Sequence, residues 1–210
     1  MDKTRFLNDI VFGWIKKDFE RMLQRIKVIP SGQGNINFPL ALCVLVDMEY
    51  LGSFLLGGDC GFNNCAGKYV QKCFKKPNEY PIEILGDIFR HGLAHEYFAR
   101  GGICREGIRP AVFNDEKIGV ILDAETLVKD FLDSLEKFKD ELSEEKYKIR
   151  MAQAKETIRE KLDKHQELIN NLPKKPTPTN SISASTTIVT GESIPFKQIS
   201  TPPSHEEDED

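Results

Sequence analysis

Residues 38–56 read FPLALCVLVDMEYLGSFLL and form the most apolar run of the chain. The run is long enough to cross a bilayer, for which a helix needs roughly 20 residues. Asp47 and Glu49 lie near its middle, however, and ionised side chains are costly at that depth in lipid. A helix that is apolar on nearly all sides belongs instead at the centre of a protein core. We therefore predict that residues 38–56 form the central helix of a soluble, all-α protein.

Helical patterns lie on both sides of this segment. Residues 4–27 predict an amphipathic helix, because apolar side chains recur there at roughly helical spacing. Those side chains are Phe6, Ile10, Val11, Trp14, Phe19, Met22, Leu23 and Ile26. A short helix is expected near residues 68–75. A longer helix should begin at Pro81, which suits a first turn, and run to about Arg100.

A different pattern follows at about residues 108–122. Two short β-prone runs flank the turn-forming residues 114–117, so we expect a small β-hairpin inserted among the helices. Asp123 should then cap a long helix with an apolar stripe that ends at Leu142. If that helix continued unbroken to residue 172 it would extend roughly 70 Å at 1.5 Å per residue, far beyond a small domain. Its second half should therefore project, fold back near Ser143 or pair with another copy.

These patterns divide the chain into three regions. Residues 1–142 form the predicted helical bundle, residues 143–172 a charged helical extension, and residues 173–210 an acidic tail. The extension carries a thin apolar seam suited to pairing: Met151, Ala154, Ile158 and Leu162. The tail is rich in Ser, Thr and Pro and ends in Glu-Glu-Asp-Glu-Asp. A segment of this composition should be disordered.

Charge is distributed unevenly along the 210 residues, which carry a formal net charge of −4. The tail holds an excess of acids, whereas residues 66–110 hold eight Lys or Arg against five acids. This basic excess is compatible with a phosphate-bearing partner. The five cysteines are an odd number, and no charged-then-apolar leader opens the chain. We therefore expect reduced thiols, a cytoplasmic location and no membrane association.

Within the basic region, residues 88–98 read IFRHGLAHEYF. Arg90, His91 and His95 stand here among apolar residues, although burying an unpaired charge is costly. Arginine binds phosphate through forked hydrogen bonds, and histidine exchanges a proton near neutral pH. A ribonuclease needs these groups and no metal, because the 2′-hydroxyl of RNA can itself attack the adjacent phosphorus. In the structural alternative, Arg90 pairs with a carboxylate and His95 is a hydrogen-bonded core histidine.

The sequence Arg-His-Gly-Leu-Ala-His at residues 90–95 resembles the signature of the HEPN family (higher eukaryotes and prokaryotes nucleotide-binding domains). That signature is an arginine, usually followed by a polar residue, several positions before a histidine. The resemblance covers residues 4–142 and implies an HEPN-like helical bundle. It also implies a metal-independent RNA endonuclease without a cofactor, of the kind found in defence or toxin–antitoxin systems. A second match to the spacing, Arg159 to His165, lies on a charged segment that we interpret as surface.

By this resemblance Arg90 and His95 are catalytic, with His91 in the polar position. HEPN members dimerise to bring two motifs together, so a homodimer is expected, with RNA as substrate and an antitoxin or other protein as a further partner. Members often carry an acid on the helix packed against the motif, which makes Glu49 and Asp47 candidate supporting acids. The two lie about 200° apart on a helix and cannot both face one neighbour, and we favour Glu49. The expected RNA-binding residues are Lys68, Lys72, Lys75, Lys76 and Arg100.

Two alternatives stay open at this point. Cys60, Cys65, Cys73 and Cys104 suggest zinc, with His91 and His95 able to complete a site, but their spacing is looser than that of structural zinc sites. We expect scattered thiols and no metal. The alternative to an enzyme is a catalytically inactive HEPN-like scaffold that binds RNA, a nucleotide or a protein through the same residues. A third class is a structural protein that oligomerises through residues 124–172.

Overall fold

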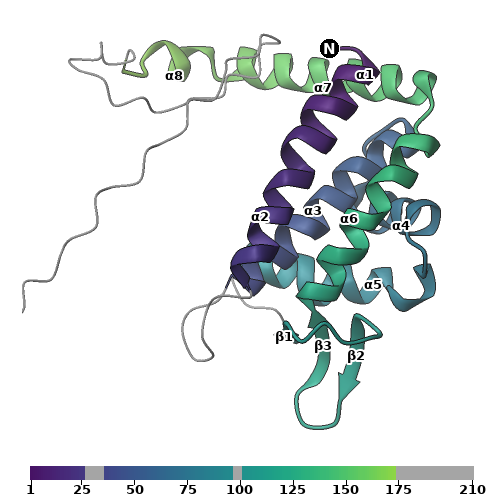
Figure 1. Ribbon diagram of the computed structural model, residues 1–210. Helices are drawn as coiled ribbons and strands as arrows, with labels where there is room; N and C mark the ends of the chain where they lie inside the picture. The colour runs from purple at the N-terminus through teal and green to yellow at the C-terminus, as the bar shows by residue number, and fades with distance from the viewer. Residues whose placement is uncertain (27–35, 97–100, 174–210) are drawn as a thin grey trace, which may run out of the picture.

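The computed structural model describes residues 1–26, 36–96 and 101–173. An N-terminal helix, α3, α4 and α6 lie against one another as a bundle, and α7 runs across one end of it (Figure 1). The helices of the first half are α1 (Lys3–Arg5), η1 (Phe6–Ile15), α2 (Lys16–Ile26), α3 (Asn37–Leu56), α4 (Gly61–Cys73), η2 (Pro77–Glu79), α5 (Ile82–Ile84), η3 (Leu85–Arg90) and η4 (Gly92–Glu96). The helices of the second half are α6 (Ala124–Glu141), α7 (Glu144–Lys164) and α8 (Gln166–Asn170).

Helix α3 is the central helix that its apolar sequence predicts. Leu40, Leu45, Met48 and Leu51 on this helix have no exposed surface. The helix is long and apolar enough to cross a membrane, but 56% of its most apolar window is buried inside the protein. Burial of this extent is typical of a core helix.

The N-terminal segment forms one continuous helix, α1–η1–α2, that packs on α6. Its middle part has π-helical hydrogen bonds, in which each N–H reaches five residues back. The backbone N–H of Lys16, for example, bonds to the carbonyl of Val11. The apolar periodicity of residues 4–27 correctly predicts a helix, but not this wider winding.

Helices α3 and α4 approach so closely that their contact requires a glycine. A Cβ added to Gly52 on α3 would lie 1.9 Å from the carbonyl oxygen of Cys65 on α4. Helix α4 begins at Gly61, whereas the sequence analysis places the start of this helix near residue 68. The earlier start means that Asn63 and Asn64 belong to the first turn of α4 instead of a loop.

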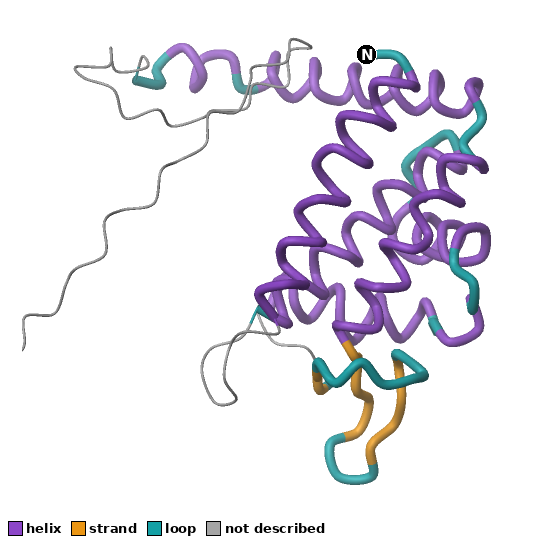
Figure 2. Tube along the Cα trace, in the orientation of Figure 1, coloured by secondary structure: helices purple, strands orange, loops and turns teal. Residues whose placement is uncertain are grey.

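A small three-stranded sheet lies at the end of the bundle opposite α7 (Figure 2). Its strands β1 (Gly102–Cys104), β2 (Val112–Asp115) and β3 (Gly119–Asp123) have the order β1-β3-β2. Strands β2 and β3 pair antiparallel and confirm the predicted hairpin. Strand β1 pairs parallel to β3 and was not predicted. The fold is therefore mainly helical with a small mixed sheet, and the prediction of an all-α protein with only a hairpin is wrong in this respect.

Asp123 links the sheet to the helix that follows it. Its Oδ1 accepts a hydrogen bond of 2.7 Å from the backbone N–H of Thr126 and so caps α6, as its position predicts. Its Oδ2 accepts bonds from the backbone N–H groups of Glu106 and Gly107, at 2.7 Å and 3.0 Å. One buried carboxylate thus fixes both the start of α6 and the loop after β1.

The long C-terminal helix breaks at Leu142 and Ser143. Leu142 has an extended backbone, and the Ser143 side chain caps α7 by accepting from the N–H of Lys146. Tyr147 of α7 is 2% exposed, and its hydroxyl donates to the carbonyl of Met1 at 2.9 Å. Contacts with the bundle thus continue beyond Leu142, into the first turns of α7. The rest of α7 projects past the bundle (Figure 1), and most of the acidic tail lies outside the described residues.

Candidate functional site

The segment with Arg90, His91 and His95 follows α5 as two π-helical stretches, η3 and η4. The backbone N–H of His91 bonds to the carbonyl of Gly86, five residues back. Residues five apart lie about 140° from one another around a regular α-helix, but π-helical turns bring them nearer to the same face. The winding of this segment therefore reduces the angle between Arg90 and His95. Phe89 and Leu93 anchor the opposite face in the core.

Arg90 pairs with the central helix. Its Nη2 donates a hydrogen bond of 3.0 Å to Oε2 of Glu49, and the two side chains are 25% and 21% exposed. The Nε of Arg90 is buried and has no hydrogen-bond partner among the described residues. Of the two acids considered for the motif, Glu49 is the one that contacts it.

Asp47 lies on a different face of α3. It makes no hydrogen bond within the described part of the chain, and burial raises the pKa of its carboxyl to about 7. The cause is desolvation, because a buried carboxylate loses its hydration without gaining a cationic neighbour. Asp47 is thus separate from the Arg90–Glu49 pair.

His91 and His95 form a pair of exposed imidazoles. Their rings stack with 5.7 Å between centroids and 21° between planes, and both residues are exposed. Neither is the core histidine of the structural alternative. The two rings lie side by side on the exposed face of the segment.

Two adjoining cavities lie beside this pair. The smaller, of about 250 Å³, is lined by His91 and Asp87 together with the start of α4. The larger, of about 590 Å³, continues over α4 to Lys68 and Gln71. Arg90 and His95 do not line either of these two cavities. The motif therefore contributes His91 to the concave surface and His95 to the exposed surface beside it.

The basic residues expected to bind RNA fall into different environments. Three of these lysines form ion pairs. Lys72 pairs with Glu141 at 3.3 Å and Lys75 with Asp133 at 2.8 Å. Lys76 pairs with Glu79 at 3.1 Å. Lys68 lines the larger cavity and has no ion pair within the described residues. Arg100 lies outside the described residues. Of this set, Lys68 is the cation best placed for a ligand.

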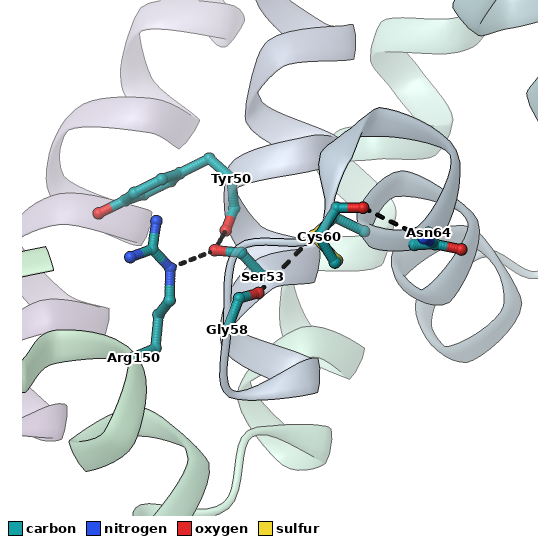
Figure 3. Close-up of a disulfide and its surroundings, with 7 residues drawn as sticks. Tyr50, Ser53, Gly58, Cys60, Asn64 and Arg150 are labelled. Carbon is teal, nitrogen blue, oxygen red and sulfur yellow. Dashed lines mark hydrogen bonds between the residues drawn. A yellow bond between two sulfur atoms is a disulfide. The ribbon is translucent and has the colours of Figure 1, made fainter. Parts of the chain in front are cut away.

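Cys60 and Cys65 form a disulfide that closes the loop between α3 and α4. The expectation that all five thiols are reduced is therefore wrong for this pair, which the spacing of the cysteines did not indicate. Beside the disulfide, Asn64 Nδ2 donates to the carbonyl of Cys60 at 3.1 Å, and Arg150 Nε of α7 donates to Ser53 Oγ at 2.8 Å (Figure 3). The loop is thus held both covalently and by its neighbours.

The remaining cysteines are separate from one another. Cys43 is exposed, Cys73 is buried and Cys104 is partly buried. Burial raises the pKa of both Cys73 and Cys104 to about 12, so these thiols are protonated at neutral pH. No cluster of three or more His, Cys, Asp or Glu side chains suited to a metal occurs in the described ranges.

Residues that the sequence analysis did not single out complete the concave surface. Asn63, Asn64, Gln71 and Asp87 line the two cavities with amides and a carboxylate. Asn63 lies against Gly86 of the motif segment. That contact joins residues far apart in the sequence, so no local sequence pattern predicts it.

The chain matches no protein-family model, no curated protein and no solved structure in comparisons with known proteins.

Proposed function

We propose that the protein is a metal-independent RNA endonuclease of HEPN type. The observation that supports the proposal best is the stacked, exposed pair of His91 and His95, on the same helical segment as Arg90. Exposed imidazoles are accessible to a phosphodiester, whereas core histidines are not. The mainly helical fold is compatible with an HEPN-like bundle.

The proposed reaction is a transesterification within RNA. One imidazole removes the proton from the 2′-hydroxyl, whose oxygen attacks the adjacent phosphorus. The bond from phosphorus to the 5′-oxygen breaks, and the other imidazole, in its protonated form, donates a proton to that leaving oxygen. The products are a 2′,3′-cyclic phosphate and a 5′-hydroxyl. Atoms and charge balance without water or a redox partner.

Arg90 supplies positive charge next to the imidazole pair. The guanidinium has five N–H donors, and the described contacts use one of them, toward Glu49. Arg90 is 25% exposed, so part of its guanidinium is accessible from solvent. Its proposed role is to stabilise the negative charge that develops on the phosphorane.

A homodimer forms part of the proposal. A two-fold contact places identical segments together, so a second motif segment would bring another Arg90 to the reacting phosphate. An antitoxin-like protein that covers His91 and His95 would then inhibit the enzyme.

The second candidate is an inactive binding scaffold, which one observation favours. Arg90 is three-quarters buried and paired with Glu49, an arrangement that also serves structure alone. In a scaffold, the same surface would hold RNA, a nucleotide or a protein without cleaving it.

Product analysis separates the two functions. The full-length protein is incubated with a labelled RNA oligonucleotide and with the same sequence carrying 2′-fluoro groups, both in EDTA. The endonuclease predicts cleavage of the RNA alone, with 2′,3′-cyclic phosphate ends. Cleavage of both oligonucleotides, or complete loss of activity in EDTA, would contradict attack by the 2′-hydroxyl. Binding without cleavage favours the scaffold.

A further inference from the structure

The two cavities beside the motif are parts of one groove. Both are lined by Cys60, Asn63 and Asn64, so they meet over the start of α4. We call the combined surface the α4 groove; it runs from His91 at one end to Lys68 at the other. Its larger part has a volume of about 590 Å³ and is open to solvent over much of its extent.

The α4 groove directly adjoins the segment with the motif. A Cβ added to Gly86 of η3 would lie 2.6 Å from Oδ1 of Asn63. Asn63 therefore lies against the backbone of the helix that carries Arg90 and His91. A ligand in the groove would extend to His91, whose ring stacks on that of His95.

The side chains that line the groove are suited to the hydrogen-bonding edge of a base. Asn64 uses one amide hydrogen on the Cys60 carbonyl, which leaves its oxygen able to accept. The side chains of Asn63 and Gln71 make no hydrogen bond to other described residues. Amides that both donate and accept can read the polar edge of an unpaired base.

The charged and aromatic side chains that line the groove indicate which part of a nucleotide it can hold. Lys68 offers a cation without an ion pair among the described residues in the larger part of the groove, whereas Asp59 in that part and Asp87 beside His91 disfavour phosphate at their own positions. Phe62, the aromatic residue among the lining residues, is 7% exposed and offers no ring face for stacking. The groove therefore suits a base and a sugar between two phosphates, held by hydrogen bonds.

We propose that the α4 groove binds one unpaired nucleotide of RNA, next to the phosphate that reaches His91 and His95. Asn63, Asn64 and Gln71 contact the base edge, and Lys68 contacts the phosphate on the far side of that nucleotide. The inference rests on the proposed function, since it takes RNA as the ligand. It adds a binding site that determines which base flanks the cleaved bond.

Binding of RNA that cannot be cleaved tests the groove independently of catalysis. The probes are fluorescein-labelled, single-stranded 12-mers of U, A and C with 2′-fluoro groups, which lack the attacking hydroxyl. Fluorescence anisotropy gives the Kd for the full-length wild type and for Lys68→Gln and Asn63→Ala. Lys117→Gln, an exposed lysine of the β2–β3 turn, and Asn8→Ala, an exposed helical asparagine, are the matched controls. Thermal melts establish that each variant is folded.

The two groove variants should change RNA binding in different ways, one through its salt dependence and the other through its base preference. Lys68→Gln should weaken binding of all three 12-mers by roughly tenfold and reduce the slope of log Kd against log salt concentration by about 0.7, the value for one phosphate contact on a single strand. Asn63→Ala should keep that slope and lose the preference among the three bases. Both controls should stay within about twofold of wild type, the scatter expected when no ligand contact is removed.

The other outcomes separate the failure of the groove from the failure of the endonuclease. Equal Kd values for the wild type and both groove variants would show that RNA binds at another surface. No binding by the wild type would show that RNA is not the ligand. Cleavage of an unmodified 12-mer is measured alongside. Weakened binding in the groove variants without any cleavage supports the groove and contradicts the endonuclease. Normal cleavage by both groove variants contradicts the groove alone.

Discussion

Arg90 and Glu49 join the motif segment to the central helix through a hydrogen bond of 3.0 Å. Both side chains are mostly buried, so the pair is shielded from water more than a surface ion pair. The contact fixes the rotation of the motif segment about its axis, because Arg90 can reach α3 from one face alone. His91, the next residue, is therefore directed to the outside.

Replacing Glu49 tests this contact. Glu49→Gln leaves the guanidinium with a weaker acceptor, while the Arg90 Nε already lacks one within the described residues. We expect the free energy of unfolding to fall by about 1 kcal/mol, between the values for exposed pairs and for buried charged hydrogen bonds. Urea denaturation at pH 7 measures it, with Glu83→Gln at an exposed position as the control. An unchanged free energy of unfolding would mean that solvent, not Glu49, stabilises the charge of the Arg90 guanidinium.

Asp47 should make stability depend on pH. Its folded-state pKa is raised to about 7, above a value near 3.9 for an unfolded chain, so the folded state holds this proton more tightly. Its contribution to stability is fully present below about pH 4 and is lost as pH rises to about 7. Asp47→Asn should therefore stabilise the protein at pH 8, by roughly 2 kcal/mol after allowance for partial exposure. It should have little effect at pH 4.

Urea denaturation of Asp47→Asn across this pH range provides the measurement. The control is Asp140→Asn, at an exposed position of α6. A stabilisation at pH 8 that does not shrink toward pH 4 would show that the carboxyl of Asp47 is not the titrating group.

The disulfide should stabilise the loop at the edge of the α4 groove. Opening it by Cys60→Ser removes a short covalent loop, worth about 2 kcal/mol by loop entropy. A thermal melt should show a lower Tm for Cys60→Ser, and reducing agent should lower the wild type to the same value. Cys43→Ser, at an exposed free cysteine, is the control. Identical melting of wild type with and without reducing agent would argue against the disulfide in solution.

The first turns of α7 should be required for a stable bundle. A chain that ends at Leu142 loses buried Tyr147 and the bond from Arg150 to Ser53. A chain that ends at Lys155 keeps both. We expect the shorter chain to be less stable by about 3 kcal/mol or more, the cost of removing a large buried side chain. Equal urea midpoints for the two chains would show that the stable helical bundle ends at Leu142.

Much of the fold could be predicted from local patterns. The apolar run of α3, the capping position of Asp123 and the turn between β2 and β3 each carry their own sequence signal, and the structure has all three. Strand β1 has only three residues, too few for an alternating pattern, and the residues of β3 that pair with it lie 19 positions further on. The π-helical turns also have no periodic signature that distinguishes them from an α-helix.

The candidate site could be predicted only in part, for the same reason. Arg90 and the two histidines lie within six residues, so their spacing is visible in the sequence. The groove depends on Asn63 meeting Gly86 and on Cys60 bonding to Cys65, which are contacts made by folding. The acids that form ion pairs with Lys72 and Lys75 are likewise distant in the sequence, since both lie on α6, 69 and 58 residues further on. Sequence reasoning therefore treated five basic residues as equivalent, whereas the structure distinguishes Lys68.

We propose that His91 and His95 are the acid–base pair of an RNA endonuclease. The most direct test is the rate of RNA cleavage by His91→Ala and His95→Ala, with His165→Ala as the matched control. His165 is an exposed histidine at the end of α7, and it belongs to the other arginine–histidine spacing match. Thermal melts of the same preparations report folding.

Each of the two motif variants should melt like wild type, because both imidazoles are exposed. Each should cleave RNA at least 10²-fold more slowly, the usual contribution of a general acid or base. His165→Ala should cleave at the wild-type rate. Wild-type cleavage by folded His91→Ala and His95→Ala, or no cleavage by the wild-type protein itself, would contradict the account.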